Sequence, residues 1–173
     1  GALVGVAGSM RDVDELVRAR EEAQRERATL EATINSLLDP HVFLEAVRDT
    51  TGTVVDFVYG AANAAACDYM HMNREDLVGA RLLDLLPGQA GTGMLDLYAE
   101  AVDTGRPLLL DDYAYPHEII GDERRFDIRA IRVGDGLSFT WRDVTDRFNA
   151  ARALAASEAK YRLLADNSSD VVA

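Results

Sequence analysis

Residues Phe139–Arg147 read FTWRDVTDR and carry the strongest structural signal in the chain. The run Leu137–Trp141 alternates apolar and polar side chains, which is typical of a strand with one buried face. Asp143 follows this strand, and a carboxylate there can accept hydrogen bonds from the first N–H groups of a following helix. Thr145 adds a second local hydrogen-bonding group. The motif therefore predicts a fixed exit from the strand into a helix.

A similar junction occurs near the start of the chain. Residues Ala7–Glu15 read AGSMRDVDE, so Arg-Asp-Val again follows an apolar run, here Ala2–Val6, which we expect to be a strand. Asp14 stands in the position of Thr145, which weakens the first copy of the motif. Repetition of a whole strand-to-helix junction is typical of tandem domains. The sequence thus predicts the tail of one domain, a complete second domain and the first residues of a third.

Composition restricts the functional classes. The 173 residues are 48% hydrophobic and 28% charged, as expected for a soluble globular protein, and Gly1 in place of Met indicates a fragment of a longer chain. The net charge of −12 argues against nucleic acid and anionic membrane surfaces as partners. The apolar runs are too short to cross a bilayer, and a single cysteine, Cys67, suits a reducing cytoplasm.

The remaining sequence alternates helical and strand patterns. Helices are expected at residues 13–38, 61–70, 74–78 and 91–104, with a short apolar segment at residues 82–86. Strands are expected at residues 41–48, 53–59, 107–114, 124–133 and 136–142. Hairpin turns are predicted at Asp49–Gly52 and at Gly134. In the first helix, Leu16 and Leu30 belong to an apolar heptad column. Arginines interrupt the neighbouring column, which contains Val13 and Ile34, so the heptad is half apolar. This pattern favours a parallel dimeric coiled coil. The alternative is a single solvated helix that packs one stripe on its own domain.

This order of elements resembles the PAS domain family over residues 37–146. The resemblance is carried by Asn63 with Ala64, Glu75–Gly79, Leu85–Pro87, Thr104–Pro107 and Trp141–Thr145. It implies an α+β fold with a five-stranded antiparallel sheet covered by short helices, and a sensory or protein-interaction role. In such domains a ligand can lie between sheet and helices, and a conformational signal passes through the flanking helices.

The resemblance divides the chain into five segments. These are residues 1–12, the last strand of a preceding PAS-like domain; 13–38, a connecting helix; 39–146, the PAS domain; 147–165, a second connecting helix; and 166–173, the start of a following PAS-like domain. The arrangement is similar to that of bacterial multi-PAS signalling proteins. Those proteins end in a diguanylate cyclase, often with a phosphodiesterase, or in a histidine kinase.

Two sets of site residues follow. Trp141, Asp143 and Thr145 are the candidates for signal coupling, with a purely structural cap as the alternative. The candidate pocket residues lie on the predicted inner face of the sheet: Phe126, Ile128, Leu137, Phe139 and Trp141. They could hold a small apolar molecule or simply fill a core.

The sequence lacks the residues by which related domains bind flavin or haem. Light-sensing flavin-binding relatives carry an Asn-Cys-Arg-Phe-Leu-Gln stretch, whereas Cys67 is followed by Asp-Tyr-Met. Haem-binding relatives place a histidine on the long internal helix, and residues 91–104 contain none; His71 lies in a link between helices. His41 and His117 show no zinc-site spacing, and Gly88–Gly93 lacks the Lys of a phosphate loop. Flavin, haem, metal and catalysis are therefore not expected.

The sequence favours a non-catalytic sensor or relay module of a cytoplasmic bacterial signalling protein. It is expected to form a homodimer through its flanking helices and to act on neighbouring PAS and output domains of the same chain. A diguanylate cyclase is favoured over a histidine kinase as the output. The alternative is a constitutive dimerisation spacer that binds no ligand.

Overall fold

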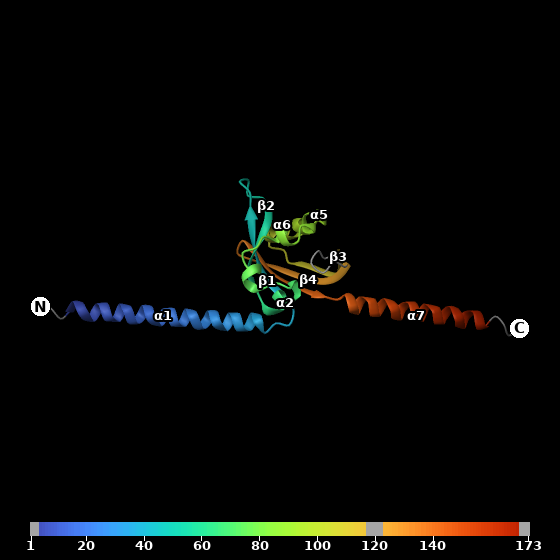
Figure 1. Ribbon diagram of the computed structural model, residues 1–173, viewed down its shortest axis with the longest axis horizontal. Coiled ribbons are helices and arrows are strands. Elements are labelled where there is room, and N and C mark those ends of the chain that lie inside the picture. The colour runs from blue at the N-terminus through green and yellow to red at the C-terminus, as the bar shows by residue number, and fades with distance from the viewer. Residues whose placement is uncertain (1–3, 117–122, 170–173) are drawn as a thin grey trace.

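Five antiparallel strands form a single sheet in the computed structural model, which describes residues 4–116 and 123–169. The strands are β1 (His41–Arg48), β2 (Val54–Ala62), β3 (Leu108–Pro116), β4 (Glu123–Val133) and β5 (Gly136–Asp143). Their order is β2-β1-β5-β4-β3, so β5 lies in the centre and pairs with both β1 and β4 (Figure 1). The predicted five-stranded antiparallel sheet is confirmed. The strand that ends at Asp143 is thus held on both sides.

Short helices between β2 and β3 cover one face of this sheet. They are α2 (Ala64–Met70), α3 (Arg74–Leu77), α4 (Leu82–Leu85), α5 (Gly88–Gly91) and α6 (Met94–Thr104). The core between the two layers is apolar, and Leu44, Phe57 and Met94 are almost completely buried in it. Each such side chain contributes about 1.5–3 kcal/mol by leaving water. The alternation predicted for β4 and β5 is confirmed, because Phe126, Ile128, Leu137 and Phe139 are buried.

The two predicted hairpin turns are confirmed. Between β1 and β2, Asp49 Oδ1 accepts hydrogen bonds from the backbone N–H of Thr51 at 2.8 Å and of Thr53 at 3.0 Å. Gly52 follows with a φ of 87°, a left-handed conformation that glycine adopts without strain. Between β4 and β5, Gly134 has a φ of 60°. These turns fix the register of the strands that they join.

Some helix boundaries differ from the prediction. Residues 61 and 62 belong to β2, where they pair with β1, so α2 begins at Ala64 rather than at residue 61. The long internal helix begins at Met94 rather than at residue 91, because Gly93 has a φ of 77° and separates it from α5. Gly105 ends α6 in the left-handed conformation, as predicted.

Two long helices flank the domain. They are α1 (Val4–Asn35) and α7 (Thr145–Ser169), and they leave the domain in opposite directions, so that the termini lie at opposite ends of the molecule (Figure 1). The helix predicted for residues 13–38 is confirmed as far as Asn35, and the one predicted for residues 147–165 is confirmed throughout. The sheet domain thus lies between two projecting arms.

The predicted strand at Ala2–Val6 is wrong for residues 4–6, which belong to α1, and Ala2 lies outside the described residues. No described strand lies beside this segment, and a strand needs a neighbour to pair its N–H and C=O groups. A helix pairs these groups within itself. The first Arg-Asp-Val is therefore helical, and α7 likewise continues through Ser169. The tandem arrangement of domains stays a prediction.

Candidate functional site

Asp143 connects the central strand to the exit helix, as the sequence predicts. Its Oδ1 accepts a hydrogen bond from the backbone N–H of Thr145, the first residue of α7, at 3.0 Å. The Thr145 hydroxyl in turn accepts from the backbone N–H of Arg125 in β4 at 2.9 Å. The backbone N–H of Val144 donates to the Arg125 carbonyl at 2.8 Å. The first turn of α7 is thus attached to both β5 and β4.

The other carboxylate oxygen of Asp143 contacts the helical layer. Tyr69 Oη of α2 donates to Asp143 Oδ2 at 3.2 Å, and Arg124 Nη1 lies 3.3 Å from the same oxygen. Partial burial raises the pKa of Asp143, but hydrogen bonds from Thr145 and Tyr69 and the charge of Arg124 outweigh it, so the pKa lies below its usual value. Asp143 is therefore a fixed anion that joins sheet, helical cover and exit helix.

Tyr69 connects this carboxylate to the inner face of the sheet. Its ring packs edge-on against Trp141, with centroids 5.8 Å apart, and against Phe126 at 6.2 Å. Burial, followed by the negative charge of Asp143, raises the pKa of the Tyr69 hydroxyl, which therefore stays protonated as a donor. The structure thus brings the predicted coupling residues Trp141, Asp143 and Thr145 together, with Tyr69 as the link between them.

Asn63 organises the entry side of the domain. Its side chain is 1% exposed, and its Oδ1 accepts from the backbone N–H of His41 at 3.0 Å and of Ala66 at 2.8 Å. Its Nδ2 donates to the carbonyls of Asp39 at 3.0 Å and Ile34 at 3.3 Å. One buried amide thus joins the end of α1, the following linker, the start of β1 and the start of α2.

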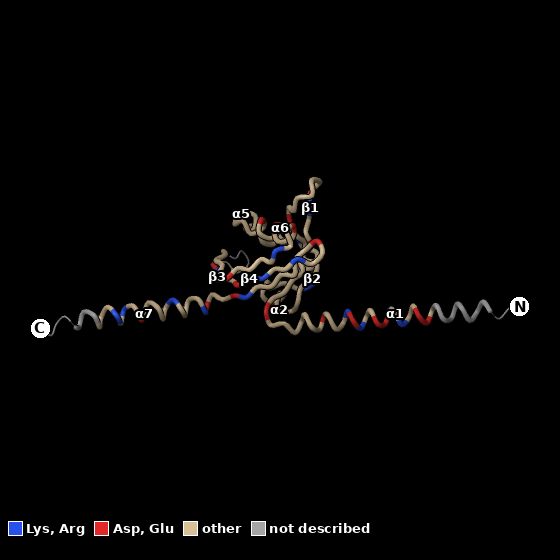
Figure 2. The backbone as a smooth tube through the Cα atoms, turned by 180° about the vertical axis from the view of Figure 1, so that it is seen from behind, with Lys and Arg blue, Asp and Glu red and all other residues tan. Residues whose placement is uncertain are grey.

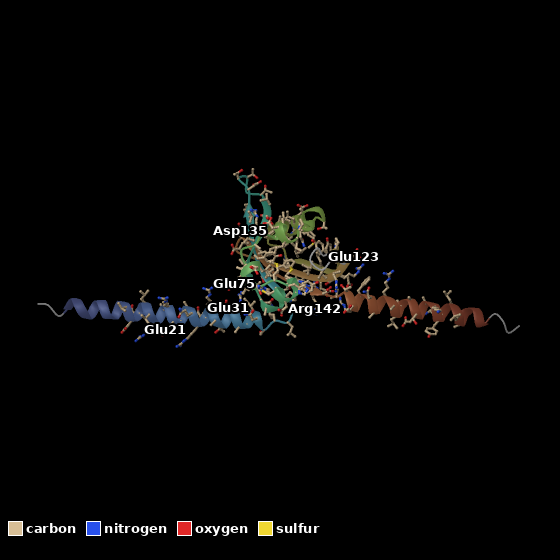
Figure 3. The ribbon with its side chains drawn as sticks, in the orientation of Figure 1. Glu21, Glu31, Glu75, Glu123, Asp135 and Arg142 are labelled. Carbon is tan, nitrogen blue, oxygen red and sulfur yellow. The ribbon has the colours of Figure 1, made fainter. Side chains whose placement is uncertain are left out.

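An ion pair connects entry to exit. Arg142 precedes Asp143 in β5, and its Nε and Nη2 donate to Asp39 Oδ1 at 3.0 Å and Oδ2 at 2.6 Å. The hydrogen bond from Arg142 holds the pKa of Asp39 below its usual value. Arg142 lies at the base of the domain, between the inner ends of α1 and α7 (Figure 3). The two parallel bonds fix the linker of α1 against the strand that leads into α7.

We call these six residues the entry–exit junction: Asp39, Asn63, Tyr69, Arg142, Asp143 and Thr145. The sequence marks Asn63 only as part of the PAS motif, and it predicts no role for Asp39, Tyr69 or Arg142. The charge of Arg142 directly before Asp143 is a local signal that could have marked it. Its partner Asp39 lies far away in the sequence, and the sequence alone does not pair them.

A cavity, partly open to solvent, lies between the sheet and the helices α2 and α4–α6. The volume open to the centre of a water molecule is about 60 Å³. Four of the five predicted pocket residues line it, namely Phe126, Ile128, Phe139 and Trp141. Leu137 is fully buried but does not line the cavity. Gln89 of α5, which the sequence placed in a glycine-rich lead-in, also lines it.

The candidate metal and thiol residues have ordinary surroundings. Within residues 4–116 and 123–169, no three His, Cys, Asp or Glu side chains gather as metal ligands. His41 Nε2 lies 2.8 Å from Ser138 Oγ, His71 ends α2 in the left-handed conformation, and His117 lies outside the described residues. Burial raises the pKa of the Cys67 thiol. None of the described helices combines the length and the apolar character that a membrane span requires.

Comparisons with known proteins identify the fold. A family model described as PAS fold matches residues 44–148, which are more than half of the chain. The chain belongs to the PAS family. No curated protein matches it significantly.

Several solved structures resemble this chain at low sequence identity. The PAS domain of Bordetella pertussis BvgS is 16% identical with a TM-score of 0.53, over 79% of this chain and 98% of that one. The Vibrio cholerae VqmA dimer is 17% identical with a TM-score of 0.50, over 70% and 52%. An RNA-binding light-oxygen-voltage receptor is 16% identical with a TM-score of 0.52, over 79% and 38%. At such identities the similarity establishes the fold.

Proposed function

We propose that this PAS domain is a non-catalytic sensor or relay module of a cytoplasmic bacterial signalling protein. A change in the domain alters the direction or packing of α7 relative to α1, and this change passes to an output domain of the same protein. We favour a diguanylate cyclase over a histidine kinase as that output. Neighbouring PAS domains are the further partners that we propose. The alternative is a dimerisation spacer that holds its neighbours together without responding to anything.

The entry–exit junction is the observation that supports a relay. Asp39 follows α1, Asp143 precedes α7, and Arg142 joins the two sides through its bond to Asp39. Tyr69 bonds to Asp143 and packs on Trp141, which lines the cavity. A displacement at the cavity wall is therefore communicated to the start of α7 through one aromatic ring. A spacer would need no such connection between its interior and its exit helix.

Amide hydrogen exchange distinguishes a relay from a spacer. We expect Asp39→Asn, which weakens the contact with Arg142 on the entry side, to speed exchange in the first turn of α7. Asp135→Asn is the matched control, because Asp135 makes a similar paired contact, with Arg48, at the far end of the sheet (Figure 3). The control should leave the first turn of α7 unchanged. Equal exchange of α7 in wild type and Asp39→Asn would favour the spacer.

Exposed apolar side chains on both arms support the proposed homodimer. On α1, Leu16 is 71% exposed and Leu30 63%, and they belong to the predicted heptad column. On α7, Leu154 and Tyr161 are similarly exposed. Acidic and basic residues mix along α1 (Figure 2), so no single charge sign opposes self-association. Pairing of the α1 helices would bury the column.

Charged substitutions in this column test the dimer. We expect the wild-type chain to sediment as a dimer, and the double variant Leu16→Glu with Leu30→Glu to sediment as a monomer, because each glutamate would be buried against its symmetry mate. Ile131→Glu, on the outer face of β4 and also exposed, is the control and should remain dimeric. A double variant that sediments like the wild type would exclude α1 as the dimer interface.

A further inference from the structure

The edge strand β3 contains a strained bulge. Its register with β4 shifts between Leu110 and Tyr113, and the two residues between them lie opposite Asp127 alone. The second of these two residues, Asp112, has a φ of 50°. Residues other than glycine rarely adopt this left-handed conformation. Backbone strain of this kind persists only where surrounding contacts hold it, so the contacts of Asp112 indicate what the bulge does.

Side chains of β4 and α7 hold the strained residue. The backbone N–H of Asp112 donates to Asp127 Oδ1 at 3.1 Å, and its carbonyl accepts from Arg125 Nη1 at 2.8 Å. Arg147 Nη2, in the first turn of α7, lies 3.4 Å from Asp112 Oδ1. Both the backbone and the side chain of Asp112 are therefore bound by groups outside β3.

The same side chains hold the start of α7. Arg147 Nη2 also lies 3.3 Å from Asp127 Oδ2, so Asp127 binds the bulge through one oxygen and α7 through the other. The Arg125 guanidinium lies over the Phe148 ring of α7, 3.7 Å from its centroid, which is a favourable cation–π contact. Arg147 is exposed, but the Asp127 side chain is only 18% exposed, so solvent screens their contact incompletely. A movement of either the bulge or the helix thus breaks contacts of the other.

We propose that the β3 bulge and the first turn of α7 form one two-state latch. In the closed state Asp112 is left-handed, and Arg125 and Arg147 hold α7 against the sheet. In the open state Asp112 relaxes into an extended conformation, and α7 loses these contacts. Because coupling between two sites is reciprocal, a change at the bulge loosens α7, and a change in α7 loosens the bulge. As a signalling element the latch rests on the relay proposed above, and it adds a route to α7 that bypasses the contact between Tyr69 and Asp143.

Asp112→Val tests the latch from the strand. A β-branched residue is strongly disfavoured in the left-handed region, so this variant should open the bulge. We expect the amide of Phe148, which donates to the Val144 carbonyl at 2.9 Å, to exchange about fivefold or more faster than in the wild type. Asp112→Asn is the matched control, because asparagine tolerates a positive φ and keeps a side-chain oxygen for Arg147. Its exchange rate at Phe148 should stay within about twofold of the wild-type rate.

Arg147→Ala tests the latch from the helix and decides the inference even if Asp112→Val fails to fold. The substitution leaves the sequence of β3 unchanged, yet we expect the Asp112 amide to exchange about fivefold or more faster. Arg152→Ala, at an exposed position farther along α7, is the control and should leave that amide unchanged.

The latch is wrong if the Phe148 amide exchanges at the wild-type rate in a folded Asp112→Val variant. A wild-type exchange rate of the Asp112 amide in Arg147→Ala would overturn it equally, because the coupling must act in both directions. Failure of the relay is distinguishable from either result, since Asp39→Asn perturbs the entry side and leaves the contacts of the bulge in place.

Discussion

Asn63→Ala should lower the free energy of unfolding by about 3 kcal/mol, measured by urea denaturation. The change removes the N-cap bond of α2, and loss of such a bond typically costs about 0.5–2 kcal/mol. It also leaves the N–H of His41 and the carbonyl of Asp39 without their side-chain partner, each at a cost of about 1 kcal/mol or more. Because Asn63 is almost completely buried, water reaches these groups poorly.

Asn73→Ala is the matched control, since Asn73 occupies the N-cap position of α3 but makes no capping hydrogen bond. Its side-chain amide donates to the exposed Asp76 at 3.3 Å. We expect its substitution to change stability by less than about 0.5 kcal/mol. If Asn63→Ala and Asn73→Ala have the same small effect, Asn63 does not hold the entry side together.

Asp143→Ala is expected to cost about 1–3 kcal/mol and to loosen the first turn of α7. The variant removes the bond to the Thr145 N–H and leaves the half-buried Tyr69 hydroxyl and Arg124 without their shared acceptor. Asp146→Ala, at an exposed position in the same helical turn, is the control and should cost less than about 1 kcal/mol. Urea denaturation measures both variants.

The dependence of stability on acidic pH provides a second test of the stabilising role of Asp143. Because its pKa is lower in the folded chain, its stabilising contribution is present above the unfolded value of about 3.9. The contribution is lost as the pH falls from there through the folded pKa. Asp143→Ala should therefore lose less stability than the wild type over this acidic range. Parallel curves for the two proteins would mean that Asp143 gains nothing from its partners.

Local sequence signals predicted the exit side of the junction well. Asp143 and Thr145 are adjacent to the strand and helix that they join, so their roles follow from short-range hydrogen bonding. The entry side depends on contacts between distant segments, such as Asn63 with Ile34 and Arg142 with Asp39. Such pairs form only when β1 and β5 lie side by side, and no local pattern contains that information.

Two differences between the sequence-based prediction and the structure have clear physical causes. The first Arg-Asp-Val motif, at residues 11–13, has the same letters as the second but no described strands beside it, so the backbone forms a helix. The same letters therefore specify a strand end only where a sheet supplies partners. Gln89 lies between glycines, which suggested a flexible lead-in. Its burial arises from packing of α5 against α4 and α6, which the local sequence does not show.

The entry–exit junction is expected to fix α1 and α7 relative to each other. Residues 26 and 158 are exposed on α1 and α7, and spin labels there report the separation of the two helices by double electron–electron resonance. The labels are placed in a Cys67→Ala background. Dilution with unlabelled chain suppresses distances between protomers. We predict one narrow distance distribution for the wild type and for Asp146→Ala, and a shifted or broadened one for Asp143→Ala. An unchanged distribution in Asp143→Ala would contradict the claim.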